Sequence, residues 1–303
     1  MEDVTEKFKD FNFRECVREI IGKKPDGAIT DADLNGIDSL DVRSKSIADL
    51  SGIEYFPVLK TLYCSDNRLT NLDVSKNVEL QTLLCDFNKL KEMDVSKNTE
   101  LRELNCGVNH LEHISVNTNI ELQTFCCDWN PLTNIDLSKN VKLEEFDCCG
   151  GQIIKLDLSG NVELKELYCD GNAFTGIDVS KNLKLEILYC RGSEFTNIDV
   201  TNNKALKEFV CSGHKLTGLD VSKNVNLEIF WCNSNRLTSI DISNNTNLKV
   251  FKCYANCLTD IDISKNLNLE EFCCYGNSIK VIDTSKNTKL KKLDCDKSAQ
   301  ILP

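Results

Sequence analysis

Cysteine recurs at a fixed spacing of 21 residues along most of this 303-residue chain. Leu stands five residues before each cysteine of the series, and Leu or Phe stands two residues before it. An unbroken period of this length is typical of a solenoid, in which each repeat is one structural unit stacked on its neighbours. The twelve cysteines of the series are Cys64, Cys85, Cys106, Cys127, Cys148, Cys169, Cys190, Cys211, Cys232, Cys253, Cys274 and Cys295.

Each repeat, numbered from its first Leu, reads L-x-x-L-x-C-x-x-N-x-L-x-x-(L/I)-D-(V/I)-S-K-N-x-x. Positions 4 and 6 should point to the same face of a short strand, because strand side chains alternate. Asn at position 9 suits a turn, where its amide can satisfy backbone groups without a ladder partner. The Asp-x-Ser-x-Asn run at positions 15 to 19 predicts a tight corner held by side-chain to backbone hydrogen bonds.

The twelve cysteines at position 6 are therefore expected to pack inside the stack as small apolar side chains. A disulfide between neighbouring repeats is not favoured, because the side chains would point in parallel. A zinc site is not favoured either, because the chain has no C-x-x-C motif and a linear column does not converge. Five further cysteines lie off the column, and three of them are expected on the exposed sheet face: Cys126, Cys149 and Cys273.

The repeat pattern resembles the leucine-rich repeat, with Cys in place of the middle strand Leu, and covers about residues 37 to 303. A first repeat at residues 37–58, with a 22-residue segment, resembles the internalins, which are bacterial surface proteins that bind host receptors. The later repeats of 21 residues resemble a branch of that family with the same cysteine column. The resemblance implies an α/β leucine-rich repeat fold. It is a curved, right-handed solenoid with a concave parallel β-sheet and a small helical N-terminal cap.

The expected organisation is a cap at residues 1–36, the first repeat at 37–58, and twelve 21-residue repeats at 59–303, the last incomplete. In the cap, Phe8, Phe13 and Val17 belong to a loosely amphipathic helical pattern, and residues 29–34 predict a second, capped helix. The family's cap is described as a truncated EF-hand. Here the calcium ligand series is incomplete, so we expect no calcium site. The unfinished last repeat predicts that the natural chain continues.

Composition narrows the classes of function. The formal net charge of -11 argues against a nucleic-acid-binding protein. No apolar run approaches the roughly 18 residues that a membrane-inserted helix needs. His110 and His113 form H-x-x-H in one repeat, which we interpret as solvated loop residues, and no catalytic motif occurs. We expect no enzyme activity, no metal and no cofactor.

Binding is expected where the repeats differ, at positions 3, 5 and 7 of the sheet's solvent face. Exposed aromatic side chains on a rigid sheet often anchor a partner, and the proposed anchors are Tyr168, Tyr189, Trp231, Tyr254 and Tyr275. Val210 is expected on the same exposed column, on the strand between Tyr189 and Trp231. The alternative is that these rings only stack across strands and stabilise the sheet. The same face is expected to include Tyr63, Phe87, Trp129, Asp128, Asp170, Glu166 and Glu208.

The surrounding carboxylates favour a basic or neutral partner. Together with the family resemblance, this predicts a surface adhesin of the virulence type that binds a host protein or glycoprotein through the concave face. A module for mucin or cell-wall glycans is one alternative, and an intracellular scaffold or effector is another. By resemblance alone, the expected location is secreted or on the cell wall, with the cytoplasm as the alternative.

Overall fold

A computed structural model describes all residues, 1–303, and divides the chain into two compact units, residues 1–143 and 144–303. The first unit contains the predicted cap, the first repeat and four of the 21-residue repeats. The second unit contains the remaining eight. Each unit is described by itself below.

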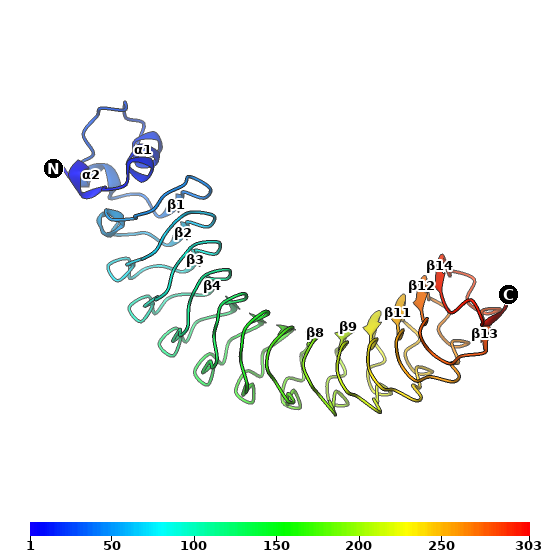
Figure 1. Ribbon diagram of the computed structural model, residues 1–303. Helices are drawn as coiled ribbons and strands as arrows, with labels where there is room; N and C mark the ends of the chain where they lie inside the picture. The colour runs from blue at the N-terminus through cyan, green and yellow to red at the C-terminus, as the bar shows by residue number, and fades with distance from the viewer. The chain divides into compact units, whose positions relative to one another are not determined.

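The first unit begins with a small helical segment that packs on the first repeat (Figure 1). A capping box between Thr30 and Asp33 starts its second helix, as the sequence predicts. Asp10 caps the first helix and also accepts a hydrogen bond from the Ala48 backbone N–H at 2.8 Å, which ties the cap to the stack. The Phe8 ring meets the Phe56 ring edge-on at 6.3 Å. The elements are η1 (Thr5–Lys7), α1 (Phe11–Ile20), α2 (Asp31–Leu34) and, in the first repeat, η2 (Ile53–Tyr55).

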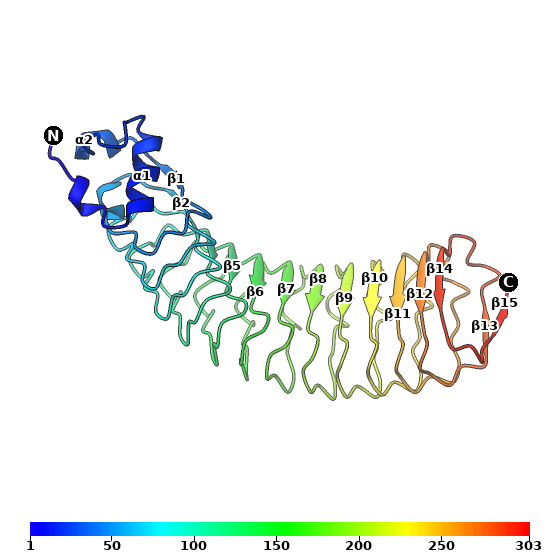
Figure 2. The same cartoon turned by 45° about the horizontal axis from the view of Figure 1, so that its top comes forward.

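Each repeat adds one three-residue parallel strand, and the strands lie side by side on one flank of the coil in each unit (Figures 1 and 2). The strands of the first unit are β1 (Ser39–Asp41), β2 (Thr61–Tyr63), β3 (Thr82–Leu84), β4 (Glu103–Asn105) and β5 (Thr124–Cys126). Those of the second are β6 (Glu145–Asp147), β7 (Glu166–Tyr168), β8 (Ile187–Tyr189), β9 (Glu208–Val210), β10 (Ile229–Trp231), β11 (Val250–Lys252), β12 (Glu271–Cys273) and β14 (Lys292–Asp294).

The strand register equals the sequence period, so equivalent residues of neighbouring repeats lie opposite each other. Leu62 pairs with Leu83, and Phe230 pairs with Phe251. A separate two-stranded pair, β13 (Val281–Asp283) with β15 (Gln300–Leu302), follows β12 and was not predicted from the sequence. This parallel solenoid with few helices is the fold that the repeat pattern predicts.

The core is built from the columns that the sequence places inward. Position 4 becomes a stack of nearly parallel Phe rings in the second unit, with centroids 5.7 Å apart between Phe209 and Phe230 and 5.5 Å between Phe230 and Phe251. The position-6 cysteines from Cys64 to Cys274 are buried, and the last of the column, Cys295, is half-buried. Burial raises the pKa of the Cys190 and Cys211 thiols well above their usual range.

Two columns of buried Asn side chains join the repeats. At position 19, the Asn203 amide Nδ2 donates to the backbone oxygens of Val179 and Asn182 in the preceding repeat, both at 2.9 Å. At position 9, the amide of Asn88 donates to the Cys64 and Cys85 carbonyls at 3.1 and 3.0 Å. These bonds tie backbone carbonyls of one repeat to the side chain of the next, outside the short strands. The sequence-based interpretation of position 19 as a backbone requirement is confirmed.

A third column runs along the residue that precedes each strand of the second unit, at position 2 of the repeat. Its charge alternates in sign from repeat to repeat, through Glu144, Lys165, Glu186, Lys207, Glu228, Lys249, Glu270 and Lys291. Each Lys forms an ion pair with the Glu of the preceding repeat, at 2.6 Å for Lys165 with Glu144 and for Lys207 with Glu186. The paired Glu of the preceding repeat raises the pKa of each of these two lysines most. The Glu of the following repeat raises it further. This column was not predicted from the sequence.

Candidate functional site

The five predicted aromatic anchors belong to the second unit and lie on the solvent side of its sheet. Each strand that carries one buries its central residue and leaves the flanking residues partly accessible, as the alternation rule requires. We call the surface formed by Tyr168, Tyr189, Trp231, Tyr254 and Tyr275 the aromatic face.

Two tyrosines form the β7–β8 end of the aromatic face. The rings of Tyr168 and Tyr189 meet edge-on with centroids 5.3 Å apart. The Tyr168 hydroxyl donates to Glu166 at 2.8 Å, and the Tyr189 hydroxyl donates to Glu208 at 2.6 Å. Partial burial, then the bond to Glu208, raises the pKa of Tyr189 to about 12. Both hydroxyls therefore keep their protons at neutral pH and both serve as donors to the carboxylates.

Asp170 lies next to this pair and is neutralised by Arg191. The Arg191 Nε donates to the Asp170 carboxylate at 2.8 Å, and a second guanidinium nitrogen lies 2.7 Å from it. The guanidinium also lies 5.8 Å from the centroid of the Tyr189 ring. Three of the four predicted carboxylates, Glu166, Asp170 and Glu208, thus lie around the tyrosine pair. The fourth, Asp128, belongs to the first unit.

The other end of the aromatic face is formed by β10 to β12. The Lys252 ammonium lies 4.0 Å from the centroid of the Trp231 ring and 3.5 Å from a Glu271 carboxylate oxygen. Tyr254 and Tyr275 stack face to face with centroids 4.6 Å apart, and Tyr275 is 39% exposed. The same Glu271 oxygen lies 2.7 Å from Lys292, so this end carries flat aromatic surface and one carboxylate shared by two lysines.

Two residues expected on this face are buried, so the prediction was wrong for them. Val210 is fully buried because it lies between the larger Tyr189 and Trp231 on the flanking strands. Cys273, expected to be exposed, is 6% exposed, and its thiol donates to the Asp294 carboxylate at 3.5 Å. Burial, then Asp294, raises the pKa of Cys273 to about 11. Cys126 and Cys149 are half-buried, and Cys257 is exposed.

The first unit holds the remaining predicted residues, on its own sheet face and at the ends of its strands. The Arg43 guanidinium lies 4.9 Å from the centroid of the Tyr63 ring. Asp128 is half-buried, whereas Phe87 and Trp129 are 57% and 65% exposed. These residues all belong to the first unit.

Phe87 and Trp129 adopt a left-handed backbone conformation, with φ of 53° and 50°. Bulky residues rarely occupy this region, which glycine adopts at no steric cost. They stand at position 8, where five repeats of the second unit have Gly, as at Gly171 and Gly192. That glycine column is the sequence signal that identifies position 8 as a left-handed turn, which was not among the predictions from the sequence.

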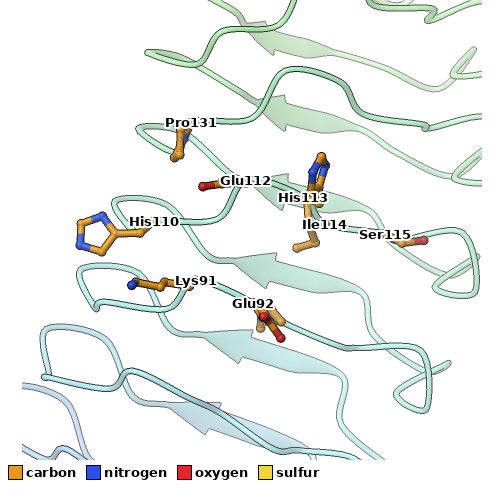
Figure 3. Close-up of a pocket in the computed structure, with 9 residues that line it drawn as sticks. Lys91, Glu92, His110, Glu112, His113, Ile114, Ser115 and Pro131 are labelled. Atoms are coloured by element: carbon orange, nitrogen blue, oxygen red, sulfur yellow. The ribbon is translucent and has the colours of Figure 1, made fainter.

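A surface hollow of about 670 Å³ in the first unit contains the H-x-x-H histidines, with Lys91, Glu92 and Glu112 around them (Figure 3). The rings of His110 and His113 point away from each other, and both residues are exposed. No group of three or more His, Cys, Asp or Glu side chains in the structure is arranged to hold a metal ion. No helix has the length and apolar character that would let it cross a membrane.

Comparison with known proteins identifies the family. No family model matches the chain. Among curated proteins, internalin J of Listeria monocytogenes serotype 4b (strain F2365) is 38% identical over 70 residues, which are 23% of this chain and 8% of that protein. This chain therefore matches less than a tenth of that relative's length.

Solved structures extend the similarity over almost the whole chain. The structure of an internalin, InlF, from Listeria monocytogenes strain 4b F2365 has a TM-score of 0.92 at 20% identity, covers 99% of this chain and 93% of its own, and supports the fold. The functional domain of InlJ from Listeria monocytogenes, described as including a cysteine ladder, has a TM-score of 0.90 at 33% identity and covers 97% of this chain and 71% of its own. With this identity, coverage and shared fold, the chain belongs to the internalin family of leucine-rich repeat proteins.

Proposed function

We propose that this chain is a non-enzymatic recognition module that binds a host protein or glycoprotein through the aromatic face. Membership of the internalin family supports a binding module, and the same relationship supports a secreted or cell-wall location and a role in adhesion. The side chains of the aromatic face support binding as well. They are aromatic rings, carboxylates and ion-paired cations, and they include no nucleophile–base pair.

The observation that carries this proposal is the row of aromatic side chains on one rigid sheet. Tyr and Trp have few rotatable bonds, so they bury a large contact area at low entropic cost when a partner docks. Ring stacking alone would stabilise the sheet, but Tyr275 remains 39% exposed, and Trp231 is half-buried with the Lys252 ammonium 4.0 Å from its ring centroid. A partner's side chains can therefore reach the Tyr275 ring fully and the Trp231 ring in part.

The test is a parallel screen of the purified chain on an array of host extracellular proteins and on an array of mucin-type and cell-wall glycans. The double variant Tyr189→Ala/Trp231→Ala should lose the signal. The matched control is Leu183→Ala/Leu267→Ala, which removes two exposed apolar side chains of the same unit away from the sheet face. This control should keep the signal.

The outcomes separate the candidate functions. A signal on host proteins that depends on Tyr189 and Trp231 supports the proposal. A signal confined to glycans with the same dependence supports the carbohydrate-binding alternative, in which the rings stack on sugars. Full binding by the Tyr189→Ala/Trp231→Ala variant, with thermal stability unchanged, would overturn the assignment of the aromatic face. Absence from the surface of intact producing cells, measured by protease shaving, would favour an intracellular effector.

A further inference from the structure

The charge of the aromatic face is unevenly distributed along the sheet. Around β7 to β9, the side chains of Glu166, Asp170 and Glu208 outnumber the single cation Arg191, so the formal charge there is -2. Around β10 to β12, Glu271 pairs with both Lys252 and Lys292, and Asp294 beside Cys273 balances the second lysine, so these four side chains have no net formal charge. One end of the face is therefore acidic, and the other is neutral and aromatic.

At the acidic end, the tyrosine hydroxyl hydrogens are already engaged in hydrogen bonds within the protein. The hydroxyls of Tyr168 and Tyr189 both donate to carboxylates, and a hydroxyl has one hydrogen to donate. What remains on these two Tyr–Glu pairs is acceptor oxygen. A ligand that fits such a surface is rich in donors and positively charged, which describes an ammonium or a guanidinium group.

The backbone places an apolar residue between the two acceptor groups. Glu166, Ile187 and Glu208 stand in register at the first residue of β7, β8 and β9. Neighbouring strands are about 4.8 Å apart, so the two glutamate backbones are separated by about 10 Å with Ile187 in the middle. Ile187 is half-buried. The aliphatic stem of a Lys or Arg side chain can lie on it while the charged head reaches both carboxylates.

We propose that the β7–β9 end of the aromatic face binds a Lys or Arg side chain of the partner protein, between Glu166 and Glu208. The adjacent apolar part of the same partner segment then lies on Trp231, Tyr254 and Tyr275. This inference rests on the proposed function and adds to it the chemical class of the occupant and its direction along the sheet.

Fluorescence anisotropy with two labelled peptides tests this inference. The probe is Lys-Gly-Lys-Gly-Lys, and its matched control has acetyl-lysine at all three positions, which removes the charge. The unmodified peptide should bind at least about tenfold more tightly at low salt, and its binding should weaken at 0.5 M salt, where the Debye length is only about 4 Å. Equal binding of the two peptides would overturn the inference.

The variant Glu166→Gln/Glu208→Gln should weaken binding of the lysine peptide about tenfold. The matched control, Glu163→Gln/Glu194→Gln, makes the same change in net charge on the second unit, at positions 21 and 10 of the repeat. Equal loss in both variants would show attraction by net charge and would overturn the site. If the first variant melts at a lower temperature, the two single variants replace it, and each should bind several-fold more weakly.

Failure of this inference can be distinguished from failure of the proposed function. An array partner that depends on Tyr189 and Trp231, together with a lysine peptide that ignores Glu166 and Glu208, overturns the inference alone. The reverse pattern overturns the proposed function and leaves a cation-binding site on the sheet.

Discussion

Because each position-19 Asn bonds the backbone of the preceding repeat, we expect the loss of one such side chain to weaken the contact between two repeats. Replacing Asn203 by Ala removes the donor for the Val179 and Asn182 carbonyls. Each of these oxygens keeps one backbone donor, from the N–H of Asn182 and of Leu185, so neither is left wholly unpaired. The loss is therefore near the low end for a buried hydrogen bond, about 1 kcal/mol each. The cavity adds about 1 kcal/mol. Removal of the Asn203 Oδ1, which is buried without a hydrogen-bond partner, offsets about 1 kcal/mol, so we expect a loss of about 2 kcal/mol.

The neighbouring Asn202 provides a matched control, because it is exposed and its side chain takes no part in the column. Asn202→Ala should change stability by no more than about 0.5 kcal/mol. Urea unfolding followed by circular dichroism measures the difference. Hydrogen exchange should locate it, with faster exchange in residues 179 to 206 and unchanged exchange in the first unit, because repeats interact mainly with their neighbours. If Asn203→Ala and Asn202→Ala unfold within about 0.5 kcal/mol of each other, the side-chain bonds do not join the repeats.

Three further predictions concern the interior of the second unit. Phe230→Ala opens a gap in the ring stack and should cost about 3 to 5 kcal/mol in urea unfolding, whereas a cost below about 1 kcal/mol would mean that the rings are not closely packed. His214 replaces the position-9 Asn and is buried, and burial lowers its pKa below the ordinary 6.5. The unfolded chain then binds the proton more readily, so stability should fall as the pH drops below about 6.5. His214→Asn should reduce this slope in pH-dependent melting, whereas exposed His113→Asn should leave it unchanged, and equal slopes in both variants would contradict the assignment. In the native protein, N-ethylmaleimide should modify exposed Cys257 quickly and buried Cys190 only on unfolding, as mass spectrometry can measure, and equal rates would contradict the burial of the column.

The periodic columns could be predicted from the sequence because each one repeats the same environment. Leu62 and Cys64 are buried because alternate side chains of a strand point to the same face, here the core. The same alternation buries the equivalent residues of every repeat between the ends. The capping box at Thr30 was predictable too, since it depends on residues three apart.

The contents of the aromatic face were less predictable, because exposure there depends on the neighbours and not on the column. Val210 occupies the same column as Tyr189, yet two large flanking side chains cover it. The hydroxyl bonds from Tyr168 to its own repeat and from Tyr189 to the next one depend on rotamers that strand alternation does not specify. The assignment of the face to partner binding remains a prediction.

The alternating charges at position 2 restrict how this protein can change in length. Duplication or loss of a single 21-residue segment within the second unit would place two lysines or two glutamates on neighbouring rungs, and like charges opposite each other across strands are unfavourable by roughly 0.2 to 1 kcal/mol. Gain or loss of two segments at once would preserve the alternation. A change of 42 residues in this region should therefore avoid a penalty of roughly 0.2 to 1 kcal/mol that a change of 21 residues carries, which favours an unchanged parity of the repeat number.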